Sequence, residues 1–371
     1  MITLASYISG HGFGHASRQV EILNALRPSH PDTRVIIRSS VDPLLLERTL
    51  RIPYDLRPGA CDPGIAQTDS LTHDDARTLA TAVAFYRDFS RRVDAEVEAL
   101  AGDDVALIVG DIPPIAFAVA KRIGVPSIAI GNFTWDWIYE RQRGFDAHTD
   151  MLAEIRAQYR KASLALRLPF SHAFDVFSRV EDLPLVARRA SRSRHDTRDH
   201  FGVPRDRPMA LLSFGGYGLP SLNLSHLDCL SEWTVVVTSQ SAEPGATRPA
   251  HVCWIPEAQM LASGFRYEDL VAAADVVVTK PGYGILGECA ANHTAMLYTS
   301  RGQFREYDLL VAEMPKYLRA RFIAQDELFA GRWLAPLRAL LAAPAPPDRL
   351  DPSGAERAAA IILQVAETPA T

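Results

Sequence analysis

A short, mostly apolar run followed by a glycine loop opens the chain and constrains its fold more than any other stretch. Residues 2–8 predict a buried β-strand, and the apolar spacing within 16–26 predicts an amphipathic helix. Between them, residues 9–15 carry three glycines at alternate positions, which lets a ligand approach the backbone and the open amides of the helix. His11 and His15 lie in this loop, at the end of a predicted parallel strand, where open α/β sheets bind their ligands. The alternative is a tight turn whose imidazoles bind only nearby backbone.

Length and charge narrow the class of protein. The 371 residues, of which 47% are hydrophobic, are enough for two domains. A formal net charge of -5 and a pI near 6.1 predict no broad basic surface for nucleic acid. The arginine-rich run within 188–198 is typical of a solvated helix face or a linker.

The use of cysteine and of apolar residues indicates a compartment. The four cysteines are widely separated and form no CxxC pair, which favours neither a zinc site nor a disulfide framework. We expect no bound metal, and a reducing cytoplasm fits this pattern. The start of the chain lacks the pattern of a signal peptide, and no apolar stretch is long enough to cross a bilayer. These features predict a cytoplasmic protein without a transmembrane segment.

Predicted strands and helices alternate along both halves of the chain. A long helical stretch is expected at 74–100. Further strands are expected at 34–38, 105–109 and 126–130 in the first half and at 209–213, 233–238, 251–255, 275–279 and 294–298 in the second. This alternation is typical of parallel α/β folds. We therefore predict the α/β class, with two Rossmann-like domains that face a central cleft.

The pattern weakens between the two halves, which indicates where the domains divide. We expect a first domain at 1–164, a linker at 165–205 and a second domain at 206–350. Residues 351–371 are expected to form a C-terminal helix that crosses back to the first domain.

Two glycine loops follow predicted strands in the second half. Open backbone amides at such helix starts suit a diphosphate. Neither loop is a Walker A motif, because the lysine precedes its glycines, and neither spells a full GxGxxG. The candidate residues are Gly215 and Gly216 in one loop and Lys280, Gly282, Tyr283 and Gly284 in the other.

Polar residues near these loops are candidate sugar ligands. Glu288 comes shortly after Gly284 in the next helix, where a carboxylate can accept both hydroxyls of a ribose. A solvent-exposed helix glutamate is the alternative. Gln303 and Glu306 follow the next strand at the same sheet edge and are candidates for binding sugar hydroxyls, although loop polarity explains them almost as well.

The first half offers a candidate general base. A histidine that takes a proton must be neutral near pH 7 and held in one tautomer, which a carboxylate partner achieves. His11 and Asp111 follow two strands of the first half, so the pattern places both at one edge without showing that they touch. Nearby, Asn132, Trp135 and Asp136 form a polar and aromatic loop that can stack on a sugar. A packed domain corner is the alternative for that loop.

Several of these motifs resemble the GT-B glycosyltransferases. Lys280 to Glu288, followed by Arg301 to Glu306, is similar to the donor region of the branch that includes the lipid-linked N-acetylglucosaminyltransferase of peptidoglycan synthesis. A stronger resemblance is to the amino-terminal, glycosyltransferase-like domain of plant L-arabinokinase. It spans nearly the whole chain and rests on residues 7–18, 132–139, 166–169, 213–216 and 280–288.

For the second half, the resemblance implies a nucleotide-sugar site. Its motifs place the two glycine loops against the diphosphate, Glu288 on the ribose, and Phe265 or Tyr267 near the nucleotide's base. Many relatives have an Asp-Gln or Glu-Gln pair after the last strand, and here the nearest match is Glu306-Tyr307. The identity of the donor sugar therefore stays open.

For the first half, the resemblance implies a GT-B acceptor site that works without metal. It places His11 or His15 as the general base and Asp111 as the carboxylate that orients it. We prefer His11 as the base and expect His15 to contact donor phosphate or sugar. The phosphate loop of the kinase domain in the plant proteins has no counterpart in this sequence, so no kinase activity is implied.

We therefore predict a glycosyltransferase that moves a sugar from a nucleoside diphosphate donor, with UDP as the expected nucleotide, to an acceptor hydroxyl with inversion. The nucleotide sugar is a co-substrate, no other cofactor is expected, and the sequence does not identify the acceptor. One alternative is a nucleotide-sugar epimerase or hydrolase on the same fold. Another is a protein that binds nucleotide sugar without catalysis, as a sensor.

Overall fold

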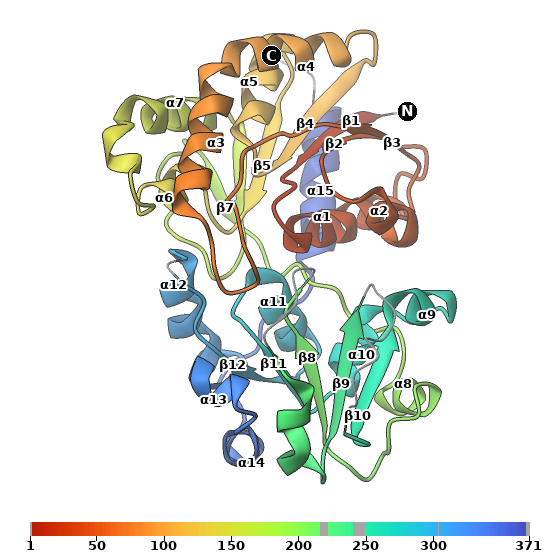
Figure 1. Ribbon diagram of the computed structural model, residues 1–371. Helices are drawn as coiled ribbons and strands as arrows, with labels where there is room; N and C mark the ends of the chain where they lie inside the picture. The colour runs from red at the N-terminus through yellow and green to blue at the C-terminus, as the bar shows by residue number, and fades with distance from the viewer. Residues whose placement is uncertain (1, 216–221, 240–248, 303, 369–371) are drawn as a thin grey trace.

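The computed structural model describes residues 2–215, 222–239, 249–302 and 304–368. Two sheets form two lobes, the first above the second in Figure 1. Within these residues the first sheet has seven strands in the order β3-β2-β1-β4-β5-β6-β7, and the second has six in the order β10-β9-β8-β11-β12-β13. All neighbouring strands run parallel. The predicted α/β class with two Rossmann-like halves is confirmed.

The strands are short, and most are buried on both faces, as expected for parallel sheets covered by helices. The first sheet contains β1 (Thr3–Ile8), β2 (Arg34–Ser39), β3 (Tyr54–Pro58), β4 (Val105–Asp111), β5 (Ser127–Gly131), β6 (Leu164–Arg167) and β7 (Val180–Asp182). The second contains β8 (Met209–Ser213), β9 (Thr234–Ser239), β10 (Val252–Pro256), β11 (Val276–Thr279), β12 (Ala295–Tyr298) and β13 (Ala320–Phe322).

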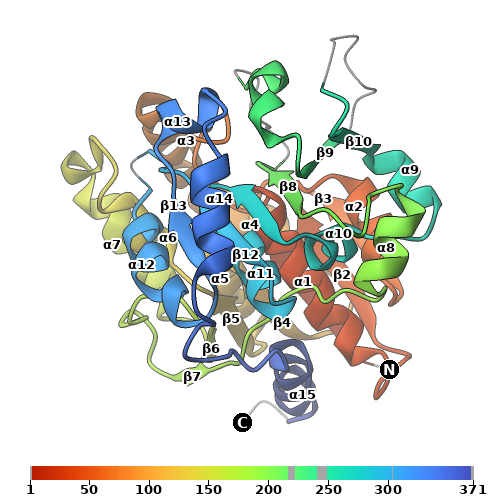
Figure 2. The ribbon, with the colours of Figure 1, turned by 90° about the horizontal axis from the view of Figure 1, so that it is seen from below.

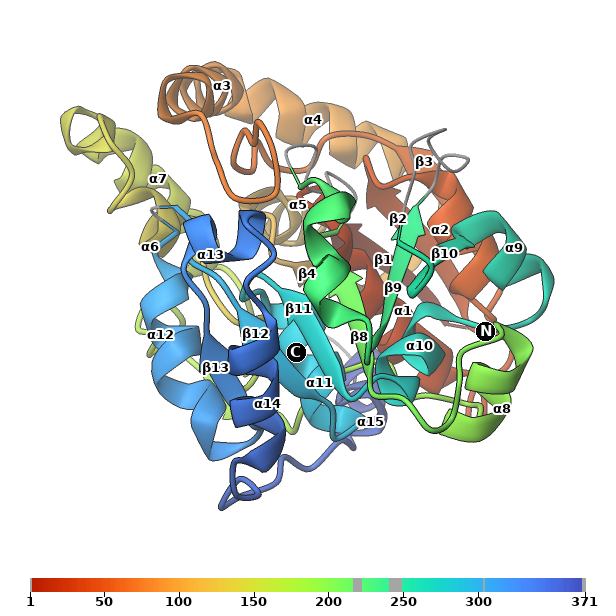
Figure 3. The same ribbon diagram turned by 60° about the horizontal axis from the view of Figure 1, so that its bottom comes forward.

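Helices cover both sheets. Those of the first lobe are α1 (Phe13–Leu26), α2 (Pro43–Thr49), α3 (Asp75–Arg87), α4 (Phe89–Ala99), α5 (Pro114–Ile123), α6 (Trp135–Tyr139) and α7 (Thr149–Tyr159). Those that follow are α8 (Arg194–His200), α9 (Glu257–Ala262), α10 (Tyr267–Ala273), α11 (Tyr283–Ala291), α12 (Glu306–Glu313), α13 (Gln325–Phe329), α14 (Leu334–Ala342) and α15 (Gly354–Glu367). Figures 2 and 3 show α12 to α14 on the side of β12 and β13, and α8 to α10 on the opposite side.

Local signals explain where several helices begin and end. The side chains of Asp42 and Asp74 accept hydrogen bonds from backbone amides at the starts of α2 and α3. Pro114 opens α5, and Gly124 ends it with a left-handed φ of 77°. The helical stretch expected at 74–100 is two helices, because the backbone at Asp88 leaves the helical region.

The C-terminal helix belongs to the core of the first lobe. α15 packs on α1 and β4, and Figure 1 shows it beside α1. Ala358 and Ile362 of α15 are fully buried in one apolar cluster with Leu23 of α1. The chain therefore crosses between the lobes twice.

The first crossing comes later in the chain than the sequence indicates. The segment expected to be a linker, 165–205, contains most of β6, all of β7 and α8. The short strands β6 and β7 close the edge of the first sheet, and their few residues carry too little apolar periodicity to reveal them. Among the described residues, no helix is both long and apolar enough to span a membrane.

Candidate functional site

The glycine loop after β1 lies at the carboxyl edge of the first sheet. α1 begins directly after Gly12, whose φ of 77° lies in the left-handed region that favours glycine. Asp111 is the last residue of β4 and pairs in register with Ile8 of β1. The first turn of α1 and the end of β4 are thereby neighbours.

The Asp111 carboxylate is fully buried and binds side chains of α1. Its Oδ1 accepts hydrogen bonds from His15 Nδ1 at 2.7 Å and from Arg18 Nη2 at 2.5 Å. Its Oδ2 accepts from Arg18 Nε at 2.6 Å and from Gln19 Nε2 at 3.2 Å. Burial alone would raise the pKa of Asp111, but the charges of Arg18 and His15 outweigh burial and lower that pKa to about 2. Asp111 is therefore an anion that fixes the His15 ring.

The bond to Asp111 determines which nitrogen of His15 is free. A carboxylate anion only accepts hydrogen bonds, so His15 Nδ1 carries a proton. In the neutral ring, Nε2 then holds the lone pair, as in a general base that a carboxylate orients. Phe133 packs edge-on against the ring, with centroids 5.5 Å apart, and restricts its rotation further.

His11 has different surroundings, and the expected pair with Asp111 is not formed. His11 Nδ1 accepts a 3.4 Å hydrogen bond from the Ile65 amide, so the proton of the neutral ring lies on Nε2. Burial, reinforced by nearby positive charges, lowers the pKa of His11 to about 3. Of the two histidines that the sequence left open as partners of Asp111, the structure pairs His15 and not the preferred His11, because the first turn of α1 brings His15 back over the end of β4.

Two cations of the second lobe lie near His11 and help to lower its pKa. Burial lowers the pKa of Lys280 to about 7, and Arg301 adds to the shift. The Lys280 amine forms no hydrogen bond or ion pair within the described residues. Arg301 packs 3.6 Å from the centroid of the Phe304 ring, and its Nη1 lies 3.4 Å from Glu306 Oε1. Arg301 was not among the predicted site residues, although it opens the segment 301–306 that resembles a donor region.

The starts of α1 and α11 meet across the boundary between the lobes. A Cβ on Gly284 would lie 3.6 Å from Gly14 Cα, an ordinary van der Waals distance, so the two backbones approach each other closely at this point. Both helices lie within the described residues, and neither has a side-chain cap or an acidic residue in its first turn. Both helix dipoles therefore direct positive potential into the same space. Tyr283, next to Gly284, stacks on Phe133 of the first lobe with ring centroids 5.9 Å apart.

Glu288, the predicted ribose ligand, is a buried residue of α11. Its Oε1 accepts hydrogen bonds from Arg188 Nε at 2.7 Å and Nη2 at 2.5 Å. Burial raises the pKa of Glu288, although Arg188 opposes the shift. Within the described residues, Oε2 accepts no hydrogen bond, so this oxygen has capacity for a ligand.

The other predicted donor residues have varied positions. Burial raises the pKa of the Tyr267 hydroxyl, and the Ser213 side chain at the end of β8 opposes this shift. Phe265 stacks on His200, with centroids 4.4 Å apart, and is therefore partly engaged within its own lobe. Gly215 is exposed, with a φ of 69°, while Gly282 is extended at the start of α11. Two predicted residues lie outside the described residues: Gly216 and Gln303.

The three predicted acceptor residues are engaged inside the first lobe. None is more than 7% exposed. Their segment enters the short helix α6, which turns the side chains inward. The partners are Arg18 for Asn132, Asp62 for Trp135 and Arg156 for Asp136. These side chains brace the wall of the site. Asn132 and Trp135 are engaged by these hydrogen bonds, whereas Asp136 Oδ1 has no hydrogen-bond partner within the described residues.

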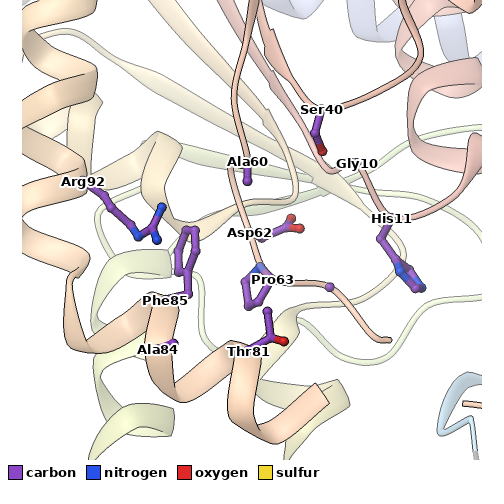
Figure 4. A pocket seen from close by; sticks show the side chains of 11 residues that line it. Gly10, His11, Ser40, Ala60, Asp62, Pro63, Thr81, Ala84, Phe85 and Arg92 are labelled. Carbon is purple, nitrogen blue, oxygen red and sulfur yellow. The ribbon is translucent and has the colours of Figure 1, made fainter. Parts of the chain in front are cut away.

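A cavity of about 410 Å³ opens beside His11 (Figure 4). Asp62 lies in its wall and accepts hydrogen bonds from Ser9 Oγ at 3.0 Å and Trp135 Nε1 at 2.9 Å. Burial raises the pKa of Asp62 to about 6. Asp62 was not among the predicted site residues, although it lies in the loop at 61–72, where the sequence places part of an acceptor site. Arg92, which lines the cavity from α4, was not among them either.

Comparisons with known proteins identify the fold. No protein-family model matches the chain. It superimposes on a UDP-glucosyltransferase from Polygonum tinctorium with a TM-score of 0.62 at 13% identity, covering 99% of both chains. It also superimposes on a Phytolacca americana enzyme solved with UDP-2-fluoroglucose and pterostilbene, with a TM-score of 0.62 at 12% identity, covering 99% of this chain and 94% of the other. The chain has the GT-B fold.

A curated relative extends the comparison to sequence. The chain is 28% identical over 341 residues to L-arabinokinase of Arabidopsis thaliana, which covers 90% of this chain and 31% of the relative. The chain thus spans about a third of that protein's length. The predicted GT-B architecture and the resemblance to plant L-arabinokinase are both confirmed.

Proposed function

We propose that this GT-B protein is a glycosyltransferase that moves a sugar from a UDP-linked donor to an acceptor hydroxyl with inversion. One observation carries the proposal. The uncapped starts of α1 and α11 meet at Gly14 and Gly284, and Lys280 and Arg301 lie close enough to His11, just before α1, to lower its pKa. Positive potential from both lobes then converges where a donor diphosphate would lie.

The lowered pKa of Lys280 supports an anion site. Its burial and the neighbouring charge of Arg301 destabilise the ammonium form in the free protein. A bound diphosphate would reverse that effect, and amides of both helices would bind its oxygens. The two solved relatives support UDP, because one is a UDP-glucosyltransferase and the other holds a UDP-sugar.

For the transfer step, we assign the general base to His15 in place of His11. The acceptor hydroxyl oxygen attacks the anomeric carbon while the bond from that carbon to the diphosphate oxygen breaks. His15 Nε2 takes the hydroxyl proton, and Asp111 stabilises the imidazolium that forms. The diphosphate leaves with the electron pair and is stabilised by Lys280, Arg301 and the helix amides.

This mechanism assigns the stabilisation of the leaving group to cationic side chains, and we propose that it proceeds without metal. Within the described residues, no group of three or more His, Cys, Asp or Glu side chains is placed to hold a metal ion. No disulfide bond joins any of the four cysteines, all of which lie within the described residues, and we propose a cytoplasmic location. Turnover of hexose-linked and pentose-linked donors distinguishes a hexosyltransferase from a pentosyltransferase.

The test is a panel of nucleoside diphosphate sugars incubated with the full chain, with and without candidate acceptors and with EDTA. A glycosyltransferase consumes one donor only in the presence of acceptor, and EDTA leaves the rate unchanged. Release of UDP or a new epimer without acceptor indicates the epimerase or hydrolase alternative. Saturable UDP binding with no turnover of any donor indicates a sensor. Failure of all UDP and dTDP compounds to raise the melting temperature contradicts the donor site.

A further inference from the structure

The cavity beside His11 has a cation at its far side. Figure 4 shows Arg92 and Phe85 on one side, His11 on the other and Asp62 between them. The Arg92 guanidinium lies 4.4 Å from the centroid of the Phe85 ring and extends from α4 toward the cavity. Its Nε is buried without a hydrogen-bond partner in the described part of the chain.

Nearby carboxylates do not neutralise Arg92. Asp88, one turn before it on the helix, pairs with Arg91 at 3.2 Å. Glu96, one turn after it, binds Arg38 Nη2 at 2.5 Å and Nε at 2.7 Å. Within the described residues, the guanidinium of Arg92 forms no hydrogen bond or ion pair.

The carboxylate within the cavity is also engaged. Each oxygen of Asp62 accepts a hydrogen bond, one from Ser9 and the other from Trp135. The cavity therefore presents an unpaired cation at one side and satisfied polar groups at the other. A buried donor without a partner is costly, so a ligand that supplies an acceptor there gains affinity.

The volume limits the size of that ligand. About 410 Å³ lies in the lower part of the range of roughly 300–1,000 Å³ that is typical of small-molecule sites. A single sugar ring fits this space, and the Phe85 face offers a surface for its apolar side.

We propose that the acceptor is a monosaccharide-sized compound with an acidic group, a carboxylate or a phosphate, and that Arg92 binds this group. The inference rests on the proposed function in that the cavity is taken as the acceptor site. His15 does not line the cavity, but it lies close enough to Asp62 in the cavity wall to lower the pKa of that carboxyl group. A planar guanidinium binds either anion through two parallel hydrogen bonds. Arg92 thereby determines acceptor specificity at the side of the cavity away from His11.

The test measures binding and does not depend on turnover. D-glucose, D-glucuronate and D-glucose 6-phosphate are titrated into the full chain by calorimetry in the presence of saturating UDP. We expect one of the two acidic sugars to bind at least about tenfold more tightly than glucose. Preference for glucuronate assigns a carboxylate, and preference for the phosphorylated sugar assigns a phosphate.

Two variants separate this role from a change in overall charge. Arg92→Gln should lower affinity for the acidic sugar by about tenfold or more and leave glucose binding nearly unchanged. Arg91→Gln is the matched control, because Arg91 lies on the same helix with its side chain 80% exposed, and it should change neither affinity.

The proposal is overturned if neither acidic sugar binds, if acidic and neutral sugars bind equally, or if both variants lose the same affinity. UDP alone is titrated separately. If the protein binds an acidic sugar through Arg92 but does not bind UDP, the proposed glycosyltransferase activity is contradicted. The proposed site for an acidic ligand is then still supported.

Discussion

Asp111 Oδ1 accepts a hydrogen bond from His15 Nδ1 at 2.7 Å, whereas His11 Nδ1 accepts one from the backbone amide of Ile65. His15→Ala should therefore lower kcat by about 10²- to 10⁴-fold, the usual contribution of a general base. UDP affinity should change little, because the base acts on the acceptor proton. Single-turnover transfer with the donor from the panel, together with UDP calorimetry, measures both effects.

His11→Ala is the comparison that discriminates between the two histidines. His11 Nδ1 is occupied by the Ile65 amide, so we expect this variant to weaken acceptor binding more than it lowers kcat. Asp111→Asn should lower kcat nearly as much as His15→Ala does, because an amide partner favours the wrong tautomer of the His15 ring. A larger loss of kcat in His11→Ala than in His15→Ala would indicate that His11, and not His15, is the general base.

UDP affinity should fall as the pH rises above 7. The pKa of Lys280 is about 7 in the free protein because of burial and Arg301, and a bound diphosphate raises it. Binding therefore takes up a proton wherever free Lys280 is neutral, and affinity is highest below pH 7, where it is already charged. Calorimetry at pH 8 in buffers of different ionisation enthalpy should show this uptake. Lys280→Met should abolish it and lower affinity by about 10- to 100-fold; release of protons from the unmodified protein would contradict the assignment.

The fold could be predicted from the sequence because its signals are local and repeated. Apolar runs such as 105–109, glycines after strands and helix caps such as Gly124 each fix a short segment, and their alternation limits the topology. The edge strand β7 has only three residues and no such pattern. It forms because β6 offers a parallel edge, which is a tertiary effect.

The location of the candidate site could be predicted from the sequence, but which of its side chains bind each other could not. Strand ends located His15, Asp111 and Lys280 at the right sheet edges. Whether Asp111 binds His11 or His15 depends on where the first turn of α1 begins, a detail of one or two residues. Arg92 lies on a helix far from any motif, so only the three-dimensional structure shows that it lines the cavity.

Glu288→Ala should reveal whether the buried carboxylate binds ribose. Its Oε1 is bound to Arg188, and Oε2 is the oxygen with capacity for hydroxyls. We expect UDP affinity to fall by about tenfold or more, while inorganic diphosphate, which lacks ribose, binds nearly as before. Loss of affinity for both ligands to the same extent would indicate a structural role. Arg188 keeps a 3.5 Å contact with Glu268, which limits the damage to the fold.

Leu71 should be needed to hold the lobes together. It lies in the loop between β3 and α3 of the first lobe, yet it is 6% exposed and packs in an apolar cluster of the second lobe with Phe214. The neighbouring Ser70 hydroxyl donates to the Phe214 carbonyl. Leu71→Ala should lower the free energy of unfolding by about 2–4 kcal/mol and increase the radius of gyration in X-ray scattering, because the lobes separate more readily.

Leu44→Ala is the control for that experiment, since it removes the same atoms from α2, where Leu44 is 47% exposed. It should change stability by about 0.5 kcal/mol or less and leave the scattering curve unchanged. If Leu71→Ala lowers stability without any change in the radius of gyration, the loop contributes to folding alone. An increase in radius that saturating UDP reverses would show that the proposed donor closes the same boundary between the lobes that Leu71 stabilises.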